Sequence, residues 1–476
     1  MRKNNALSQI LIVGSGGLSA QFITVLSTFV VTRLYSPEHY AAWAILIATV
    51  AIIGGNCTLR YETAIVLPSD SRHAAQLFLL SSLLSLGSAG LLAMGFFLCG
   101  GFIDNHLGTS GIGSLRYLLC LLVACTGITA SCQGWFTRVR EFWVVALSAG
   151  LLAAFTLIAQ FTAAMIGTNN ANGLIVGTII GQTASTFILV CILVYRHPYA
   201  VFGNFSWRDL RATAWNYRNY PRYITPYSVI QDLTTRSALY LMTIFSPGAA
   251  VGYFAFASRL SSFPVTLLGG AIRPVLYQKA SVSRTAELQE YVLSLMRLII
   301  KVGTPLWIFF IFNASLLMKI GFGSAWEPAS RFAVVLSISA SIQLLSGWMD
   351  RLFDVRGKQR LAFQLQFFFS CASIAALVVG HWLFKDVFGA ICLQVAVLTI
   401  QFLSCLYIAF RISDFQTSTL TKCATEFIKI AAIMSTVAVA ISGFSLPYRC
   451  FIYLCASVIY ATRNVQLELN YLRATA

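Results

Sequence analysis

Charged residues are scarce in this chain of 476 residues, since only 10% are Asp, Glu, Lys or Arg, against roughly 25% in soluble domains. Apolar residues make up 58% of the chain instead. So little charge excludes a soluble globular enzyme, a disordered chain and a nucleic-acid-binding protein. The composition is typical of a polytopic membrane protein, for which membrane lipid is the main partner.

Acidic residues are the scarcer charged class, with 16 Asp and Glu against 33 Lys and Arg, a net charge of +17. The basic residues stand between apolar runs, so membrane topology explains the excess better than nucleic acid does. Of the 33, 22 fall in segments on one side of the predicted membrane, 6 on the other and 5 within spans. Because cytoplasmic loops carry the basic excess, we predict that both termini are cytoplasmic.

Several familiar motifs are absent as well. The chain has no GxxxxGK[ST] and no CxxC, so a nucleotide-binding P-loop is excluded and the twelve cysteines are interpreted as small apolar residues. No catalytic residue, cofactor or metal site is predicted. The first apolar run, residues 7–31, is too long for a signal peptide and is interpreted as a membrane span.

Apolar runs of about 20 residues are the strongest feature that is present. They lack the alternation of barrel strands, so we predict helices. The predicted spans are residues 7–31, 39–58, 72–98, 115–136, 142–166, 173–195, 225–246, 249–272, 298–320, 330–349, 361–383, 387–410, 424–444 and 447–462. The prediction is an all-α membrane protein with about fourteen transmembrane helices, and twelve is the alternative because the last two runs are the weakest.

The longest connection on the predicted cytoplasmic side runs from Arg196 to Ile224 and is both basic and aromatic. Such a stretch is typical of a segment that lies on the anionic inner leaflet. A dedicated contact with a substrate is the less favoured alternative.

Two motifs recur along the chain. YSP at 35–37 returns as FSP at 245–247, and GWFTR at 134–138 returns as GWMDR at 347–351. Both repeats shift by six predicted spans, which indicates a parallel duplication about an axis along the membrane normal. We therefore predict two six-helix lobes, 1–200 and 201–415, followed by a C-terminal helical pair, 416–476.

Two such lobes suggest a cavity between them, where transporters bind their substrates. Asp232, Arg236 and Arg259 lie within predicted spans. At 1.5 Å per residue, Arg236 lies roughly 18 Å from the cytoplasmic end of its span and Arg259 roughly 16 Å from the outer end of the next. Charges at that depth are costly in lipid and indicate a wet cavity. Asp232 can neutralise only one of the two arginines, so the cavity should be cationic and suited to phosphate or pyrophosphate. The alternative is a structural Asp232–Arg236 pair.

Charged residues near the ends of the spans are further candidates. Arg33 stands at the outer end of the first span, where it lines the vestibule or simply extends to the headgroups. Arg60 and Glu62 follow the second span. They either pair across the inner mouth of the cavity, in a coupling or gating role together with Asp232, or hold a turn.

Two stretches carry a family resemblance. TRLYSPEHYAAWAIL (32–46) followed by LRYETAIVLPSD (59–70) resembles the opening of Wzx-type polysaccharide flippases, relatives of MATE exporters and lipid II flippases. SPGAAVGYFAFASRL (246–260) and FGSAWEPASRF (322–332) agree, so the resemblance covers most of residues 7–410.

The resemblance implies alternating access in a bacterial inner membrane. The cargo would be an undecaprenyl-pyrophosphate-linked oligosaccharide for O-antigen, lipopolysaccharide or exopolysaccharide. The flippase would move it from the cytoplasmic to the periplasmic leaflet, with ion coupling. Arg33, Arg236 and Arg259 are where it places substrate binding. A polysaccharide polymerase and a chain-length regulator are implied partners. The charges at Asp232 and Arg236 depart from the family pattern.

Two other interpretations stay open. A MATE-like drug or cation antiporter shares the architecture but needs acidic residues in its cavity, where only Asp232 qualifies. A non-transporting component of polysaccharide assembly, such as a polymerase, would be expected to carry a long outer loop. The longest predicted outer loop is only residues 98–114.

Overall fold

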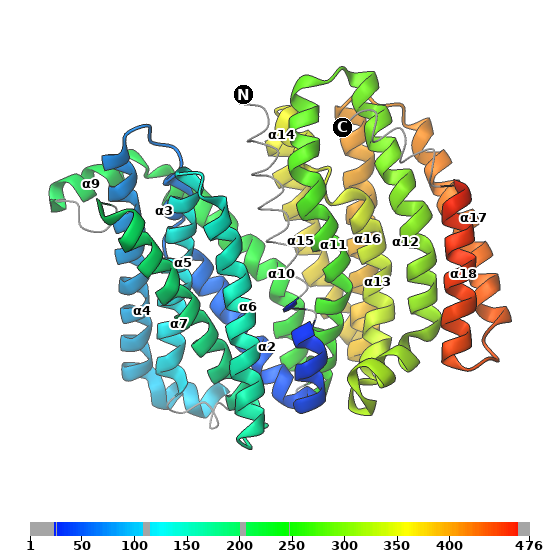
Figure 1. Cartoon of the computed structure of the whole chain (residues 1–476), viewed down its shortest axis with the longest axis horizontal. Helices are drawn as coiled ribbons and strands as arrows, with labels where there is room; N and C mark the ends of the chain where they lie inside the picture. Colours follow the sequence, from blue (N-terminus) through cyan, green and yellow to red (C-terminus); the bar gives the residue numbers. More distant parts are fainter. Residues whose placement is uncertain (1–22, 25, 108–114, 200–205, 247, 465–476) are drawn as a thin grey trace. The chain divides into compact units, whose positions relative to one another are not determined.

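The computed structural model describes residues 23–464 apart from 25, 108–114, 200–205 and 247. Over these ranges the chain forms helices joined by turns, and none of the described residues lies in a strand (Figure 1). The predicted all-α membrane fold is confirmed.

Within the described part of the chain, ten helices are long and apolar enough to cross a membrane. They are α2 (Pro37–Asn56), α4 (Ser71–Leu107), α5 (Leu115–Arg138), α6 (Phe142–Met165), α7 (Ala171–Arg196), α12 (Thr285–Phe322), α13 (Ala329–Ser346), α15 (Gln359–Phe384), α16 (Val387–Ile412) and α17 (Ser418–Ala440). Each contains or overlaps a predicted span. The count of fourteen stays approximate.

The other four predicted spans differ from these ten. Three form the helices α10 (Thr225–Phe245), α11 (Ala249–Val282) and α18 (Leu446–Asn464). Charged residues lie within α10 and α11, among them Asp232, Arg236 and Arg259. The fourth is the first predicted span, which is helical over residues 23–34 apart from 25 and otherwise lies outside the described residues.

The chain divides into two compact units, Met1–Tyr240 and Leu241–Ala476. The first also contains two short elements, α3 (Tyr61–Ala64) and α9 (Trp207–Asn216), and the π-helical turn η1 (Tyr220–Ile224). The second contains the 3-10 turn η2 (Ser324–Trp326) and α14 (Asp350–Val355). The lobes expected from the repeated motifs remain a prediction, and Pro247 of the second FSP motif lies outside the described residues.

Side chains before the first turns explain where several helices begin. Ser36 accepts a hydrogen bond from the backbone N–H of His39, and Pro37 occupies the first position of α2. Asn170 caps α7 in the same way by accepting from the N–H of Gly173, at 3.1 Å. These side chains satisfy amides that have no partner within the helix, while proline at the first position loses nothing.

Helices α11 and α12 correct one prediction. They contain 34 and 38 residues, so at 1.5 Å per residue each is over 50 Å long, against a hydrocarbon core of about 30 Å. The connection predicted at residues 273–297 is therefore mostly helical. Its two arms pack together through buried Leu276, Leu288 and Tyr291, and the ammonium group of Lys279 lies 4.4 Å from the Tyr291 ring. This α11–α12 hairpin extends beyond the bilayer.

The last two helices pack on α12 in the second unit. Lys301 of α12 forms an ion pair with Glu426 of α17 at 3.7 Å. The hydroxyl of Tyr453, in α18, donates to the carbonyl of Pro305 at 2.9 Å. Pro305 lies inside α12, where proline removes a backbone hydrogen bond. The C-terminal helices thus contact α12 around this interruption.

Candidate functional site

A tight reversal of the backbone after α2 builds the candidate site. The N–H of Leu59 bonds to the carbonyl of Asn56 at 3.0 Å, and the N–H of Tyr61 bonds to that of Thr58 at 3.2 Å. Leu59 and Arg60 both have positive φ, 51° and 61°, a region that side chains other than glycine seldom occupy. Backbone strain of this kind is typical of functional sites. It starts the short helix α3 and directs Arg60 away from the axis of α2.

Helix α5 approaches this reversal closely at Gly134. A Cβ atom at that position would lie 2.6 Å from the carbonyl oxygen of Glu62 and 3.2 Å from a methyl group of Ile65. Only glycine leaves room for the backbone of α3 here. Gly134, the glycine of the first GW motif, therefore lets the backbone of Glu62 pack directly against α5.

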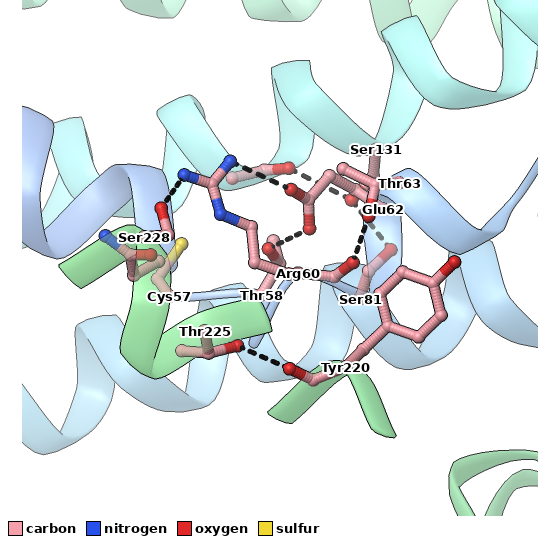
Figure 2. A network of polar contacts seen from close by, with 12 residues as sticks. Cys57, Thr58, Arg60, Glu62, Thr63, Ser81, Ser131, Tyr220, Thr225 and Ser228 are labelled. Carbon is pink, nitrogen blue, oxygen red and sulfur yellow. Dashed lines mark hydrogen bonds and ion pairs between the residues drawn. The ribbon is translucent and has the colours of Figure 1, made fainter. Parts of the chain in front are cut away.

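Four charged side chains of the first unit form a chain of alternating sign. Glu62 lies 3.6 Å from the guanidinium of Arg60. Arg60 in turn lies 4.0 Å from Asp232, and Asp232 pairs with Arg236 at 2.9 Å. We name the series Glu62–Arg60–Asp232–Arg236 the charge network; its Arg60 end is drawn in Figure 2. Its formal charges sum to zero. The cationic sum expected from the sequence includes Arg259, which is not part of this network, and stays a prediction.

Helices α2 and α10 carry these groups along a polar seam. Thr49 contacts Tyr240 between hydroxyl oxygens at 2.9 Å, and Asn56 donates to Asp232 at 3.1 Å. One turn beyond the end of α2, Arg60 donates to the hydroxyl of Ser228. Residue numbers rise along α2 while those of the partners fall along α10, so the two helices run antiparallel. The seam holds Asp232 between the arginines.

Glu62 is the most enclosed member of the network. Its side chain is 8% exposed, whereas those of Arg60 and Asp232 are 27% and 24% exposed. The hydroxyl of Thr58 donates to one carboxylate oxygen and Arg60 faces the other (Figure 2). A buried carboxylate is stable only when it is paired in this way.

Two buried polar atoms beside Asp232 have no hydrogen-bond partner among the described residues. They are the Nε of Arg60 and the Oδ1 of Asn56. Buried donors and acceptors are nearly always satisfied in folded proteins. These two atoms therefore leave hydrogen-bonding capacity at the point where α2 and α10 meet.

Four of the six residues singled out from the sequence meet in the charge network. Arg33 does not lie near it: this exposed residue precedes α2, whose 20 residues separate the two ends by about 30 Å. Arg259 lies half-buried within α11, in the second unit. It stays a candidate on its own helix.

Sequence reasoning missed three polar partners as site residues: Asn56, Thr58 and Ser228. The segment GGNCTLRYE placed an amide and a hydroxyl beside the predicted inner mouth, which was a usable signal. Ser228 was visible only as one of many hydroxyls in its helix. Its contact with Arg60 joins residues 168 positions apart, and no local pattern shows such a pairing.

Residues 30–331 match the family described as polysaccharide biosynthesis protein. The chain belongs to this family. The match includes α2, α3 and α10, and thus the whole charge network. No curated protein matches the chain in sequence.

Solved structures with a similar fold include a flippase and several transporters. The lipid II flippase MurJ, in an inward closed conformation, matches with a TM-score of 0.70 and 13% identity over 95% of this chain and 98% of MurJ. An inward-facing MATE family multidrug resistance transporter matches with a TM-score of 0.65 and 14% identity, over 83% of this chain and 95% of its own. A MOP superfamily transporter from Pyrococcus furiosus matches with a TM-score of 0.58 and 14% identity, over 85% of this chain and 95% of its own. The chain thus has the fold of MOP superfamily transporters.

Proposed function

We propose that this protein is a flippase for lipid-linked oligosaccharides. It moves an undecaprenyl-pyrophosphate-linked repeat unit from the cytoplasmic to the periplasmic leaflet by alternating access. The family supports a role in polysaccharide biosynthesis, and the fold supports transport. Neither bears on the cargo, so the charge network carries that part of the proposal.

The network supports an anionic cargo that is taken up together with a proton. Asp232 contacts both Arg60 and Arg236, so it is the shared counter-charge of two guanidinium groups. Protonation of Asp232 would give the network a net charge of +1 and release the faces of both arginines. A guanidinium group binds phosphate oxygens in pairs, which suits a pyrophosphate.

Release of the cargo would follow from the same chemistry in reverse. When Asp232 loses its proton, its carboxylate competes with the pyrophosphate for Arg60 and Arg236. Glu62 stays held by Thr58 and Arg60 and keeps the reversal in place. In this mechanism Asp232 couples ions to transport and the two arginines bind the headgroup. Arg33 and Arg259 are proposed as further contacts for the cargo.

The deciding experiment compares Asp232→Asn with Arg236→Gln in cells that depend on this protein for surface polysaccharide. Asp232→Asn keeps the size of the side chain but cannot cycle a proton, so surface polysaccharide should be lost at normal protein level. Arg236→Gln should lose it as well. Asp354→Asn is the matched control, because it removes an acidic partner of Arg351 in the second unit, at 3.1 Å, and should leave polysaccharide unchanged. Normal polysaccharide in Asp232→Asn would refute the coupling role.

A drug or cation antiporter is the second candidate. It is favoured by the likeness to MATE transporters and by the enclosed Glu62, a second carboxylate in contact with Arg60 of the charge network. An antiporter would change drug susceptibility when Glu62 or Asp232 is replaced and would leave surface polysaccharide intact. The proposed flippase gives the opposite pattern.

The proposed setting is a bacterial inner membrane with both chain termini in the cytoplasm. A flippase of this kind delivers its cargo to a polymerase and a chain-length regulator in the periplasm, and these are its proposed partners. A pull-down of the tagged protein from cells that make the polysaccharide would test this association.

A further inference from the structure

Five side chains follow one side of α9 and the turn after it. Trp207, Arg211 and Trp215 are spaced by four residues, which keeps them on one side of α9. Arg218 and Arg222 follow in the turn and in η1, and their guanidinium groups lie at the Trp215 ring. Trp207 and Trp215 are 80% and 62% exposed. We name these five residues the tryptophan–arginine stripe.

The opposite side of α9 is fixed to the first unit. Leu210 and Thr213 are buried, and the hydroxyl of Thr213 donates to Gln76 of α4 at 2.7 Å. Asp209 forms an ion pair with Arg72, also of α4, at 3.5 Å. Thr213 and Asp209 both contact side chains of α4 and hold α9 against it (Figure 1). The stripe therefore lies on the side of α9 that faces away from α4.

Trp215 brings two positive charges together. The guanidinium carbons of Arg218 and Arg222 lie 4.5 Å and 5.8 Å from the centre of its ring. A tryptophan ring attracts such cations through its negative face. Asp209 is the only acidic residue between 206 and 224, and it is engaged by Arg72 on the inner face. The stripe therefore combines an apolar ring with uncompensated positive charge.

We infer that the tryptophan–arginine stripe binds anionic phospholipid of the leaflet on its side of the membrane. The segment joins α7 to α10, two helices with predicted cytoplasmic ends there, so its distance from the headgroups is set by its neighbours. Tryptophan favours the level of the headgroups, and arginine binds their phosphates. A soluble anionic partner would not need the two exposed indoles. The inference is independent of the cargo, since it concerns the bilayer lipid.

The test measures binding of a fluorescent phosphatidylglycerol to the purified full-length protein in detergent micelles. Each arginine near an anionic surface adds roughly fivefold to binding. The double variant Arg218→Gln/Arg222→Gln should therefore bind the probe about 25-fold more weakly. Phosphatidylcholine should compete poorly with the probe for the wild-type protein.

Two controls separate binding from folding and from total charge. Arg284→Gln removes an exposed arginine at the tip of the α11–α12 hairpin, beyond the headgroup level, and should bind like the wild type. The double variant Arg218→Lys/Arg222→Lys keeps the charge and should recover most of the binding. Each variant must elute as a monodisperse peak with wild-type helicity.

The inference is overturned if Arg218→Gln/Arg222→Gln binds the probe as tightly as the wild type. It is also overturned if phosphatidylcholine competes as well as unlabelled phosphatidylglycerol, because the site would then not select charge. Should pyrophosphate displace the probe while phosphatidylglycerol does not, the stripe would bind the soluble anion and the lipid assignment would be wrong. None of these results depends on whether the protein flips an oligosaccharide.

Discussion

The hydroxyl of Tyr61 donates a hydrogen bond to the backbone carbonyl of Ala214 at 3.0 Å, and this bond joins α3 to α9. Tyr61 stands between Arg60 and Glu62 of the charge network, while Ala214 precedes Trp215 of the tryptophan–arginine stripe. The candidate transport site and the proposed lipid surface are thus connected by one bond.

Replacement of this tyrosine tests the connection. Tyr61→Phe removes the donor and leaves the carbonyl of Ala214 without it, so we expect a loss of about 1 kcal/mol in the free energy of unfolding. Chemical denaturation in detergent measures it. Tyr195→Phe is the control, because Tyr195 is 88% exposed and should show no loss. An equal effect in both variants would contradict the role of the bond.

The close approach of α5 to α3 predicts a second effect. Gly134→Ala places a methyl group against the backbone of Glu62, and overpacking of this kind costs about 1–3 kcal/mol. Gly150→Ala, in α6, meets nothing within 4 Å and should be neutral or stabilising. The melting temperature of Gly134→Ala should fall below that of the wild type, whereas that of Gly150→Ala should stay the same or rise. Equal shifts would contradict the packing argument.

Arg259 predicts a loss of function without a loss of protein. Arg259→Ala should abolish surface polysaccharide while the protein still accumulates, because we propose that this half-buried arginine contacts the anionic cargo. Arg259→Lys should restore only part, since lysine lacks the planar fork. Immunoblots of membranes and polysaccharide gels measure the two quantities. If protein and polysaccharide fall together, Arg259 has a packing role instead.

The start of α9 predicts a response to acid. The pKa of Asp209 lies below its ordinary value because its carboxylate accepts the backbone N–H of Ser206, with the guanidinium of Arg72 adding a smaller effect. A lowered pKa in the folded state stabilises the cap above the unfolded pKa, and this stabilisation is lost as pH falls through the folded pKa.

Hydrogen exchange of residues 207–216, corrected for intrinsic rates, should therefore rise as pH falls below the ordinary range of aspartate. Asp209→Asn should exchange faster at neutral pH and show little further change. Asp70 also has a lowered pKa, through the backbone N–H of Arg72, so Asp70→Asn is the control and should keep the acid response of α9. A response that persists in Asp209→Asn would exclude this carboxylate as its origin.

Membrane topology can be tested with reporter fusions. The excess of basic residues on one side predicts that residues 168–172 and 208–218 lie on opposite sides of the membrane. A periplasmic reporter should be active at the first site and a cytoplasmic reporter at the second. Activity of the same reporter at both would mean that the number of spans before residue 208 is wrong.

The helices were largely predictable because an apolar run that crosses lipid must satisfy its backbone hydrogen bonds internally, and a helix does so. The predicted spans 115–136 and 387–410 end within two residues of α5 and α16. The α11–α12 hairpin was not predictable in this way, since polarity marks where a chain leaves the bilayer and not where its helix ends. There the helices continue because their two arms bury apolar residues against each other.

The site was predictable only where its partners are close in sequence. The spacing of Asp232 and Arg236 allows an ion pair one helical turn apart, and the structure has it at 2.9 Å. Arg60 and Asp232 are far apart in sequence and meet only because α2 and α10 pack antiparallel. No residue pattern specifies that packing, so the contact that joins the Arg60–Glu62 pair to the Asp232–Arg236 pair could not be predicted. The roles of these residues in transport stay predictions.

The length of the α11–α12 hairpin has a further consequence for how this protein responds to its surroundings. Within lipid, helices associate by close contact, because tails are as apolar as the side chains they replace. Beyond the headgroups the buried Leu276, Leu288 and Tyr291 are held together by the exclusion of water instead. The outer half of this helix pair is thus stabilised by water, and the inner half by packing within lipid. Urea, which acts through water, should open the hairpin before it reaches the membrane-embedded half of the same helices.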